Sequence, residues 1–352
     1  MKTPETARNL FHLLFVILII LIPGTAFSQE AGTCAEKLKS AQAFFEKGQV
    51  DQVPELLKNC LKSGFKREEE LSAYKLLIQT FLLNDKLEQA DSAMYAFLKK
   101  NPEYKISPTD HSSFVYLFNS FVVKPVVQIG VHALTNIPFL TFIAENQTSG
   151  EPGKSVYKTN AANLYISLET KFRISRKLEF GIEAGYSQMK FTNIVNYLGF
   201  GIINYKETQQ RLEIPVNLTY DITSFGKFIP YGRVGLGAAY NLSTSAEVSF
   251  NVTDKNNLNN RTGETLNRKD SRVPLDFFGQ IGAGMKFKIP RGYLFAEVRS
   301  NFGIRNQNVQ GGKTVDLLQN YYLWTDPGFR INSLNLNIGY TLVFYKPSKK
   351  KA

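Results

Sequence analysis

Along the carboxy-terminal two thirds of the chain, apolar and polar side chains alternate with a period of two residues. Leu212, Ile214 and Val216 alternate with charged or polar neighbours, and similar runs recur toward both ends of this region. Successive side chains of an extended chain point to opposite faces, so each run predicts a β-strand with one apolar face. Eight strands are expected, at residues 125–136, 162–174, 177–191, 207–221, 227–241, 272–288, 292–304 and 332–346.

The connections between these strands alternate in length. Short turns are expected at 175–176, 223–226 and 290–291, and long polar loops at 137–161, 192–206, 242–271 and 305–331. Antiparallel strands of even number, with short turns on one rim and long loops on the other, are typical of an outer-membrane β-barrel whose short turns face the periplasm. A soluble β-sandwich is the alternative. The long strands, with Tyr and Phe near their ends, favour the barrel.

The face opposite the apolar one carries charges. An eight-stranded barrel is only wide enough to be filled by its own side chains, so inward charges must pair with one another. We therefore expect a salt-bridged lumen rather than a pore. By alternation, its six acidic and six basic members are Glu169, Glu179, Glu183, Glu213, Asp276, Glu297, Lys171, Arg173, Arg211, Arg233, Lys286 and Arg299.

The first 28 residues form a separate segment. A basic start precedes an apolar run at 10–22, and small residues stand at Ala26 and Ser28. A membrane anchor is the alternative, but a helix over this run would rise only about 20 Å, less than a hydrocarbon core of about 30 Å. We expect residues 1–28 to be a secretory signal peptide, cleaved before Gln29.

Residues 29–119 show helical periodicity instead of alternation. Apolar residues recur there at spacings of three and four, which predicts helices. Asp51 is expected to cap the second helix, with Pro54 in its first turn. The helices are expected at about 34–48, 51–64, 66–83, 86–100 and 110–118.

The helical segment has an internal similarity. The hairpin at Phe44 resembles the one at Phe81, 37 residues later, which is close to the 34-residue period of tetratricopeptide repeats. The expected fold is thus a small tetratricopeptide-like domain at 29–119, an eight-stranded antiparallel transmembrane barrel at 123–346, and a solvated basic tail at 347–352. A helical bundle that only fills space is the alternative for the first domain.

The chain contains two cysteines, Cys34 and Cys60. Cys34 begins the first expected helix and Cys60 lies near the end of the second, so an antiparallel hairpin makes them neighbours. Export makes oxidation favourable, and we expect a structural disulfide rather than two free thiols. Two cysteines exclude a disulfide-dense scaffold and a multi-cysteine metal site.

Several strand segments resemble a known family. Residues 211–218, with the sequence RLEIPVNL, residues 230–237, with PYGRVGLG, and the opening run PVVQIGV at 125–131 are similar to the PorT-type outer-membrane barrel family. The resemblance covers about 123–346 and implies an outer-membrane barrel. Through the family's namesake, it also implies an accessory role in protein secretion or envelope assembly. No catalytic or ligand-binding residue is carried over.

Few residues suggest catalysis or cofactor binding. His111 follows Asp110 at a helix start, where a surface or capping role is expected. His132 is expected to face the lumen as a hydrogen-bonded side chain, because no serine nucleophile motif accompanies it. Residues 254–260 begin like a calcium loop but lack its glycine and its final glutamate. We expect no catalytic residue, no metal and no cofactor.

The most economical function is that of a non-enzymatic, monomeric outer-membrane barrel, embedded in lipid, that anchors a periplasmic protein-interaction module. The net charge of +12 is spread along the chain, and we expect no nucleic-acid partner. A hydrolase acting near His132, a narrow channel and a surface-loop receptor are the alternatives. The module is joined to the first strand by 119–124, and its expected docking residues are Lys39, Gln42, Glu46, Lys75 and Gln79. The alternative is that the module only caps the periplasmic mouth of the barrel.

Overall fold

The computed structural model describes residues 31–144, 155–159, 163–197, 199–253, 260–309 and 315–350. The expected signal peptide at 1–28 lies outside these residues, as does nearly all of the segment 254–260. The chain divides into two compact units: Met1–Val122 with Pro347–Ala352, and Val123–Lys346. Each unit has its own packing and is described by itself below.

The first unit is helical. Its helices are α2 (Ala31–Glu46), α3 (Val53–Lys62), α4 (Arg67–Leu83), α5 (Leu87–Lys100) and α6 (Ser112–Asn119), with a short 3-10 turn, η1 (Val50–Gln52), before α3. Leu57 on α3 and Ala73 on α4 belong to one apolar core of this unit and are fully buried. Among the described residues, no helix is long and apolar enough to cross a membrane.

A disulfide joins α2 to α3. Cys34 and Cys60 are bonded, with their Cα atoms 5.6 Å apart, and both are buried. Gly64 follows α3 with a φ of +130°, and a Cβ atom there would lie 2.8 Å from the Cys34 Sγ. The chain therefore uses a glycine both for its backbone conformation and for the space that the disulfide occupies.

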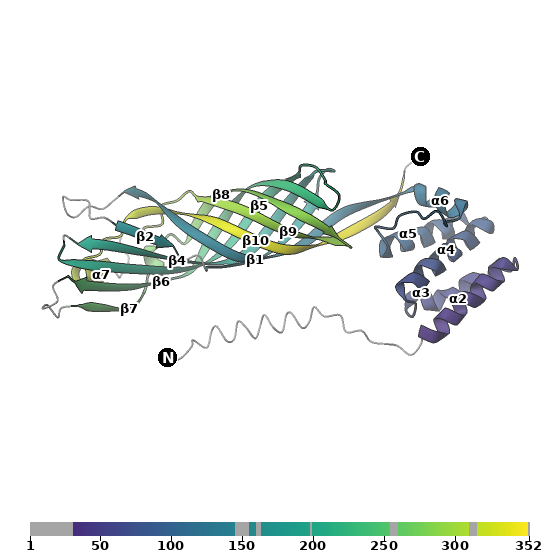
Figure 1. The fold of residues 1–352 in the computed structure, drawn as a ribbon, viewed down its shortest axis with the longest axis horizontal. Helices are drawn as coiled ribbons and strands as arrows, with labels where there is room; N and C mark the ends of the chain where they lie inside the picture. Colours follow the sequence, from purple (N-terminus) through teal and green to yellow (C-terminus); the bar gives the residue numbers. More distant parts are fainter. Residues whose placement is uncertain are drawn as a thin grey trace. The chain divides into compact units, whose positions relative to one another are not determined.

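The second unit is a closed antiparallel barrel (Figure 1). Going around it, the strands follow the order β4-β3-β1-β10-β9-β8-β6-β5, and β5 pairs with β4 to close the ring. Two shorter strands extend the wall at one end: β2 (Ser155–Thr159) pairs with β4, and β7 (Arg261–Asn267) pairs with β6. The ring strands are β1 (Phe121–Ala144), β3 (Asn163–Arg173), β4 (Leu178–Tyr197), β5 (Gly201–Asp221), β6 (Phe228–Val252), β8 (Leu275–Ile289), β9 (Gly292–Gly303) and β10 (Gly328–Lys349).

An apolar band surrounds the middle of the barrel. On β5 its members are Leu212, Ile214, Val216, Leu218 and Tyr220, whose side chains are all exposed on the outer face. At one edge of the band, Leu212 pairs with Tyr186 on β4 and with Tyr240 on β6; at the other edge stands Tyr220. Aromatic residues at both edges of an outward apolar band match the girdles of a membrane-spanning barrel.

Several strands continue well beyond this band, where long loops were expected. The loop predicted at 192–206 is largely strand, because β4 runs to Tyr197 and β5 starts at Gly201; the loop predicted at 242–271 contains the end of β6 and all of β7. The reason is that the polar and the apolar face of the strand are exchanged beyond the band. On β5, Lys206 and Thr208 face outward while Ile203 and Tyr205 are buried, so the outer face becomes polar and the inner face apolar.

A β-bulge on β6 turns the apolar side chains of its last part toward the inside of the barrel. The register between β5 and β6 shifts at Gln210 and Arg211, so that Leu242 is an extra residue on β6. Inward positions are odd-numbered up to Asn241 and even-numbered from Thr244 onward. Without the extra residue, Val248 would face outward, because a shift of one residue moves every following side chain to the other face.

The extended end of the barrel contains a second apolar core. Helix α7 (Val315–Tyr322) lies at this end together with β2 and β7 (Figure 1). Leu318 from α7 and Trp324 beyond it pack with Tyr205 from β5, and the Trp324 and Tyr205 rings stack with centroids 4.3 Å apart. The segment predicted as a loop at 305–331 thus supplies a helix and a plug of side chains.

Candidate functional site: a charge-filled lumen

Strand alternation brings the predicted charged residues together inside the barrel. Eleven of the twelve predicted residues are buried. The exception is Arg173, whose side chain is about 18% exposed. Ten of the other eleven take part in an ion pair, while the eleventh, Glu213, lies within hydrogen-bonding reach of Ser187. Burial of this many charges is tolerable only because each has an opposite charge or a hydrogen-bond partner beside it.

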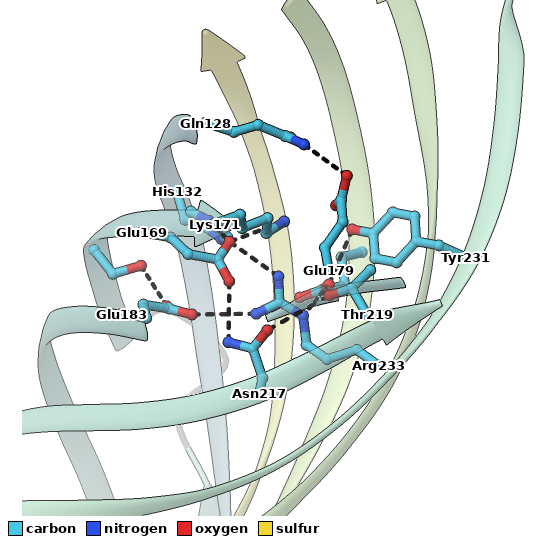
Figure 2. A network of polar contacts seen from close by, with 12 residues as sticks. Gln128, His132, Glu169, Lys171, Glu179, Glu183, Asn217, Thr219, Tyr231 and Arg233 are labelled. Carbon is cyan, nitrogen blue, oxygen red and sulfur yellow. Dashed lines mark hydrogen bonds and ion pairs between the residues drawn. The ribbon is translucent and has the colours of Figure 1, made fainter. Parts of the chain in front are cut away.

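Arg233 on β6 is the centre of the network (Figure 2). Its guanidinium nitrogens lie 3.0 Å from Glu169, 3.3 Å from Glu183 and 3.0 Å from Glu297. All four side chains are completely buried or nearly so. The three carboxylates come from β3, β4 and β9, so this single arginine links strands on different sides of the barrel.

Two further cations balance the three carboxylates. Arg299 lies 3.0 Å from Glu183 and 2.6 Å from Glu297, and the Lys171 ammonium lies 3.0 Å from Glu169. Three acids and three bases therefore form an electrically balanced cluster. The His132 Nε2 lies 2.9 Å from Glu169, and Asn217 donates to the same carboxylate at 3.0 Å.

A second layer lies nearer the short turns. The Lys286 ammonium lies 2.8 Å from Glu179 and 2.7 Å from Asp221, and Arg173 pairs with both of these acids. Gln128 also donates to Glu179, at 2.6 Å (Figure 2). Asp221 was missed by the sequence analysis because it was placed at a strand end, although it shares the inward parity of Glu213.

A third layer lies toward the extended end. Arg211 donates to Asp276 at 2.8 Å, and Gln307 donates to the same carboxylate at 2.8 Å. Beyond this pair, Arg272 lies 2.6 Å from Glu207 and 3.0 Å from Asp326. These last three residues were not predicted.

The alternation of inward and outward residues along each strand could have predicted two of those three residues, Glu207 and Arg272. Glu207 has the same parity on β5 as Arg211, and Arg272 has the same parity as Asp276 across the start of β8. Asp326 lies in an irregular segment before β10, where alternation gives no signal. Arg268 also pairs with Asp326, so the network reaches the apolar core around Trp324.

His132, the residue on which the hydrolase alternative depends, lies in the lumen beside two carboxylates. Ser167 pairs with His132 across the β1–β3 ladder, but its hydroxyl donates to Glu183 at 2.5 Å and not to the imidazole. His132, Glu169 and Glu183 could place one ligand atom each within 4.8 Å of one another. However, Arg233 pairs with both of these carboxylates, and such neutralised carboxylates in contact with a cation are poorly suited to a metal ion.

The expected docking residues of the helical unit differ in their exposure. Lys39, Gln42 and Glu46 are exposed on α2, whereas Gln79 on α4 is only partly exposed. Lys75 is not a free docking residue, because its ammonium lies 2.6 Å from Asp110 and above the Tyr104 ring.

Other predictions for this unit also had mixed outcomes. His111 caps α6 as expected, because its side chain accepts from the Ser113 N–H. Asp51 does not cap α3, since the N-cap residue is Gln52 and Asp51 accepts instead from Asn84 at 2.8 Å. The basic tail predicted at 347–352 begins as strand: β10 continues to Lys349, which pairs with Asp91.

The chain belongs to the outer membrane protein beta-barrel domain family. The family model matches residues 126–307, which is just over half of the 352-residue chain. Membership places the protein in the outer membrane, as the apolar band and its girdles indicate. No curated protein matches the chain.

Solved outer-membrane barrels show distant similarity. Neisserial surface protein A is 13% identical, with a TM-score of 0.32, and the match covers 62% of this chain and 97% of that one. OprG from Pseudomonas aeruginosa is 9% identical, with a TM-score of 0.30 and coverages of 64% and 98%. The outer membrane protease OmpT from Escherichia coli is 7% identical, with a TM-score of 0.38 and coverages of 63% and 98%. Similarities this distant do not transfer a function to the chain.

Proposed function

We propose that the protein is a non-enzymatic, monomeric outer-membrane anchor: a filled eight-stranded barrel of PorT type that carries a periplasmic, tetratricopeptide-like module for binding an envelope protein. The observation that supports it best is the lumen, where ion pairs extend from the Asp221 layer to the Asp326 layer. A barrel filled in this way serves as a support rather than as a path for solutes.

The strand order supports a periplasmic position for the module. The register places Val127 of β1 opposite Phe172, close to the turn between β3 and β4, and places Leu342 of β10 opposite Gly292, close to the turn between β8 and β9. Both chain ends therefore join the wall on the short-turn rim. In outer-membrane barrels this rim faces the periplasm.

The exposed face of α2 is the proposed docking surface. Lys39, Gln42 and Glu46 are spaced by three and four residues and so lie on one exposed side of the helix, bordering the buried Leu38. The disulfide at Cys34 fixes the start of this helix. A rigid helix face with mixed charge suits a partner segment that brings complementary polar groups.

Site-specific photocrosslinking in native membranes tests this role. A photoreactive residue at Gln42 should give one dominant crosslinked envelope protein. The same residue at Glu88, which is exposed on α5, is the matched control and should not give that product. If both positions give the same products, or if Gln42 gives none, the docking surface is wrong.

A further inference from the structure

The outer wall of the barrel has a second surface above the membrane band. Its first rows are polar: Gln188, Gln210 and Ser243 are paired across β4, β5 and β6, directly beyond the row of Tyr186, Leu212 and Tyr240. The surface is therefore continuous with the lipid-facing wall but is unsuited to hydrocarbon. Because β4, β5 and β6 stay paired here, this surface is an ordered sheet.

A hollow lies in this polar surface. It has a volume of about 500 Å³ and is lined mainly by polar residues. Four of its residues form one row across four strands, where Lys206 is paired in register with Thr192 and with Glu247, and Glu247 is paired with Thr265. We call the hollow the outer groove; its remaining lining residues are Asn204, Val248, Ser249 and Gly263.

The height of the outer groove excludes an ordinary phospholipid headgroup as its ligand. Six residues separate Lys206 from Leu212 at the edge of the band, about 20 Å of strand at roughly 3.4 Å per residue. At a strand tilt of about 40° this is about 15 Å along the membrane normal. Headgroup regions add only about 5 to 8 Å on each side of the hydrocarbon core. The outer groove therefore lies where the sugar portion of an outer-leaflet glycolipid would be.

The side chains that line the outer groove suit sugar hydroxyls. Among the residues that line the outer groove, Lys206 is the one base, and it is matched by one acid, Glu247, 3.1 Å away. Asn204, Ser249 and Thr192 supply hydrogen-bond donors and acceptors of the kind that pair with hydroxyl groups. We propose that the outer groove binds the saccharide portion of lipopolysaccharide in the outer leaflet. The proposal uses the orientation argued above but not the docking role.

Saccharide binding can be measured directly. Full-length protein in phosphatidylcholine nanodiscs would be titrated with lipid-free oligosaccharide released from the lipopolysaccharide of the same bacterium, and followed by saturation-transfer-difference NMR. Saturable binding is expected. Ser249→Trp fills the outer groove and should weaken binding at least tenfold, as should Glu247→Ala, which removes an acceptor. Arg330→Trp, at an exposed site on β10, should leave binding unchanged.

Three results would overturn the proposal: no saturable binding to the wild-type protein, equal binding to the wild-type and Ser249→Trp proteins, or equally strong competition by lipid A that lacks the core and outer sugars of lipopolysaccharide. Heat-modifiable gel migration of each variant shows that its barrel is folded, so a binding loss is not mistaken for misfolding. Failure of the Gln42 crosslink would leave this titration unaffected, so the two proposals fail separately.

Discussion

Arg233 shows how strongly one residue can control the lumen. It is fully buried and lies against Glu169, Glu183 and Glu297. Arg233→Met would remove one positive charge and leave the cluster with one acid too many in a place that water does not reach. We expect a loss of about 3 to 5 kcal/mol in the free energy of unfolding. Urea titration in lipid vesicles, followed by the fluorescence of the single Trp324, measures this.

A surface pair gives the comparison for Arg233. Lys206 and Glu247 form an ion pair at 3.1 Å whose side chains are 45% and 59% exposed. Exposed pairs contribute about 0 to 1 kcal/mol, so Lys206→Met should change the free energy of unfolding by no more than that. Equal effects of the two substitutions would mean that the lumen charges are solvated, which would contradict a filled lumen.

Asp110 makes the stability of the helical unit depend on pH. Burial by itself raises the pKa of Asp110, but hydrogen bonds from Lys75, Tyr104 and the Ser107 backbone outweigh it and hold the pKa below 3.8. The folded-state pKa is thus lower than the unfolded one. This contribution to stability is present above about pH 4 and is lost as the pH falls through the folded-state pKa.

Substitution of Asp110 tests this contribution. Asp110→Asn removes a charged acceptor and should lower the free energy of unfolding by about 1.5 to 3 kcal/mol at pH 7, with a smaller difference from wild type once the pH has fallen through the folded-state pKa of Asp110. Helix ellipticity during urea unfolding reports it. Asp85→Asn, at an exposed site with a φ of +54° that asparagine tolerates, should stay within about 0.5 kcal/mol of wild type. A difference between Asp110→Asn and wild type that does not vary with pH would contradict the charged-acceptor role.

The residues of the lumen could be predicted because alternation assigns a face without reference to distant contacts. It identified Glu183 and Arg299, which are far apart in sequence and 3.0 Å apart in the structure. It could not show that Lys75 pairs with Asp110, because that contact depends on how α4 packs near α6. Nor could it place Asp326, which lies in an irregular segment.

Among the elements, the α2–α3 hairpin depends most on one covalent bond. The disulfide joins residues 26 positions apart, and closing a loop of this size stabilises the folded state by about 3 to 4 kcal/mol. The double substitution Cys34→Ala and Cys60→Ala should lower the stability of the helical unit by about that amount, measured by ellipticity during urea unfolding. Wild-type protein under reducing conditions is the control and should unfold at nearly the same urea concentration. A change below about 1 kcal/mol would contradict the bracing role.

Strand ends were harder to predict than strand centres, for a physical reason that β5 illustrates. Within the membrane the outward residues must be apolar, so Leu212 to Tyr220 are easily recognised. Beyond it the same strand faces water, and an outward Lys206 beside an inward Tyr205 reverses the pattern. A search for one continuous apolar face therefore starts this strand at residue 207, six residues after its true start at Gly201.

For the molecule as a whole, the filled lumen predicts that the barrel does not conduct ions across a membrane. Paired charges occupy the lumen, and the core around Trp324 lies at its extended end. The full-length protein in planar lipid bilayers should give no unitary current steps above baseline at 100 mV. A general 16- to 18-stranded porin, added to the same bilayer, is the positive control. Stable, reproducible steps would support the narrow channel instead.

The central claim is that the barrel is an anchor and the helical unit is what binds partners. Deletion of residues 31–119 tests it most directly, because α6 ends at Asn119 and β1 begins at Phe121, so every strand is kept. Crosslinked complexes would be purified from native membranes and their proteins compared by mass spectrometry. We predict that the shortened chain still inserts, shows heat-modifiable migration, and loses the partner that the full-length chain retains. Recovery of the same partner by the inserted, shortened chain would contradict the claim.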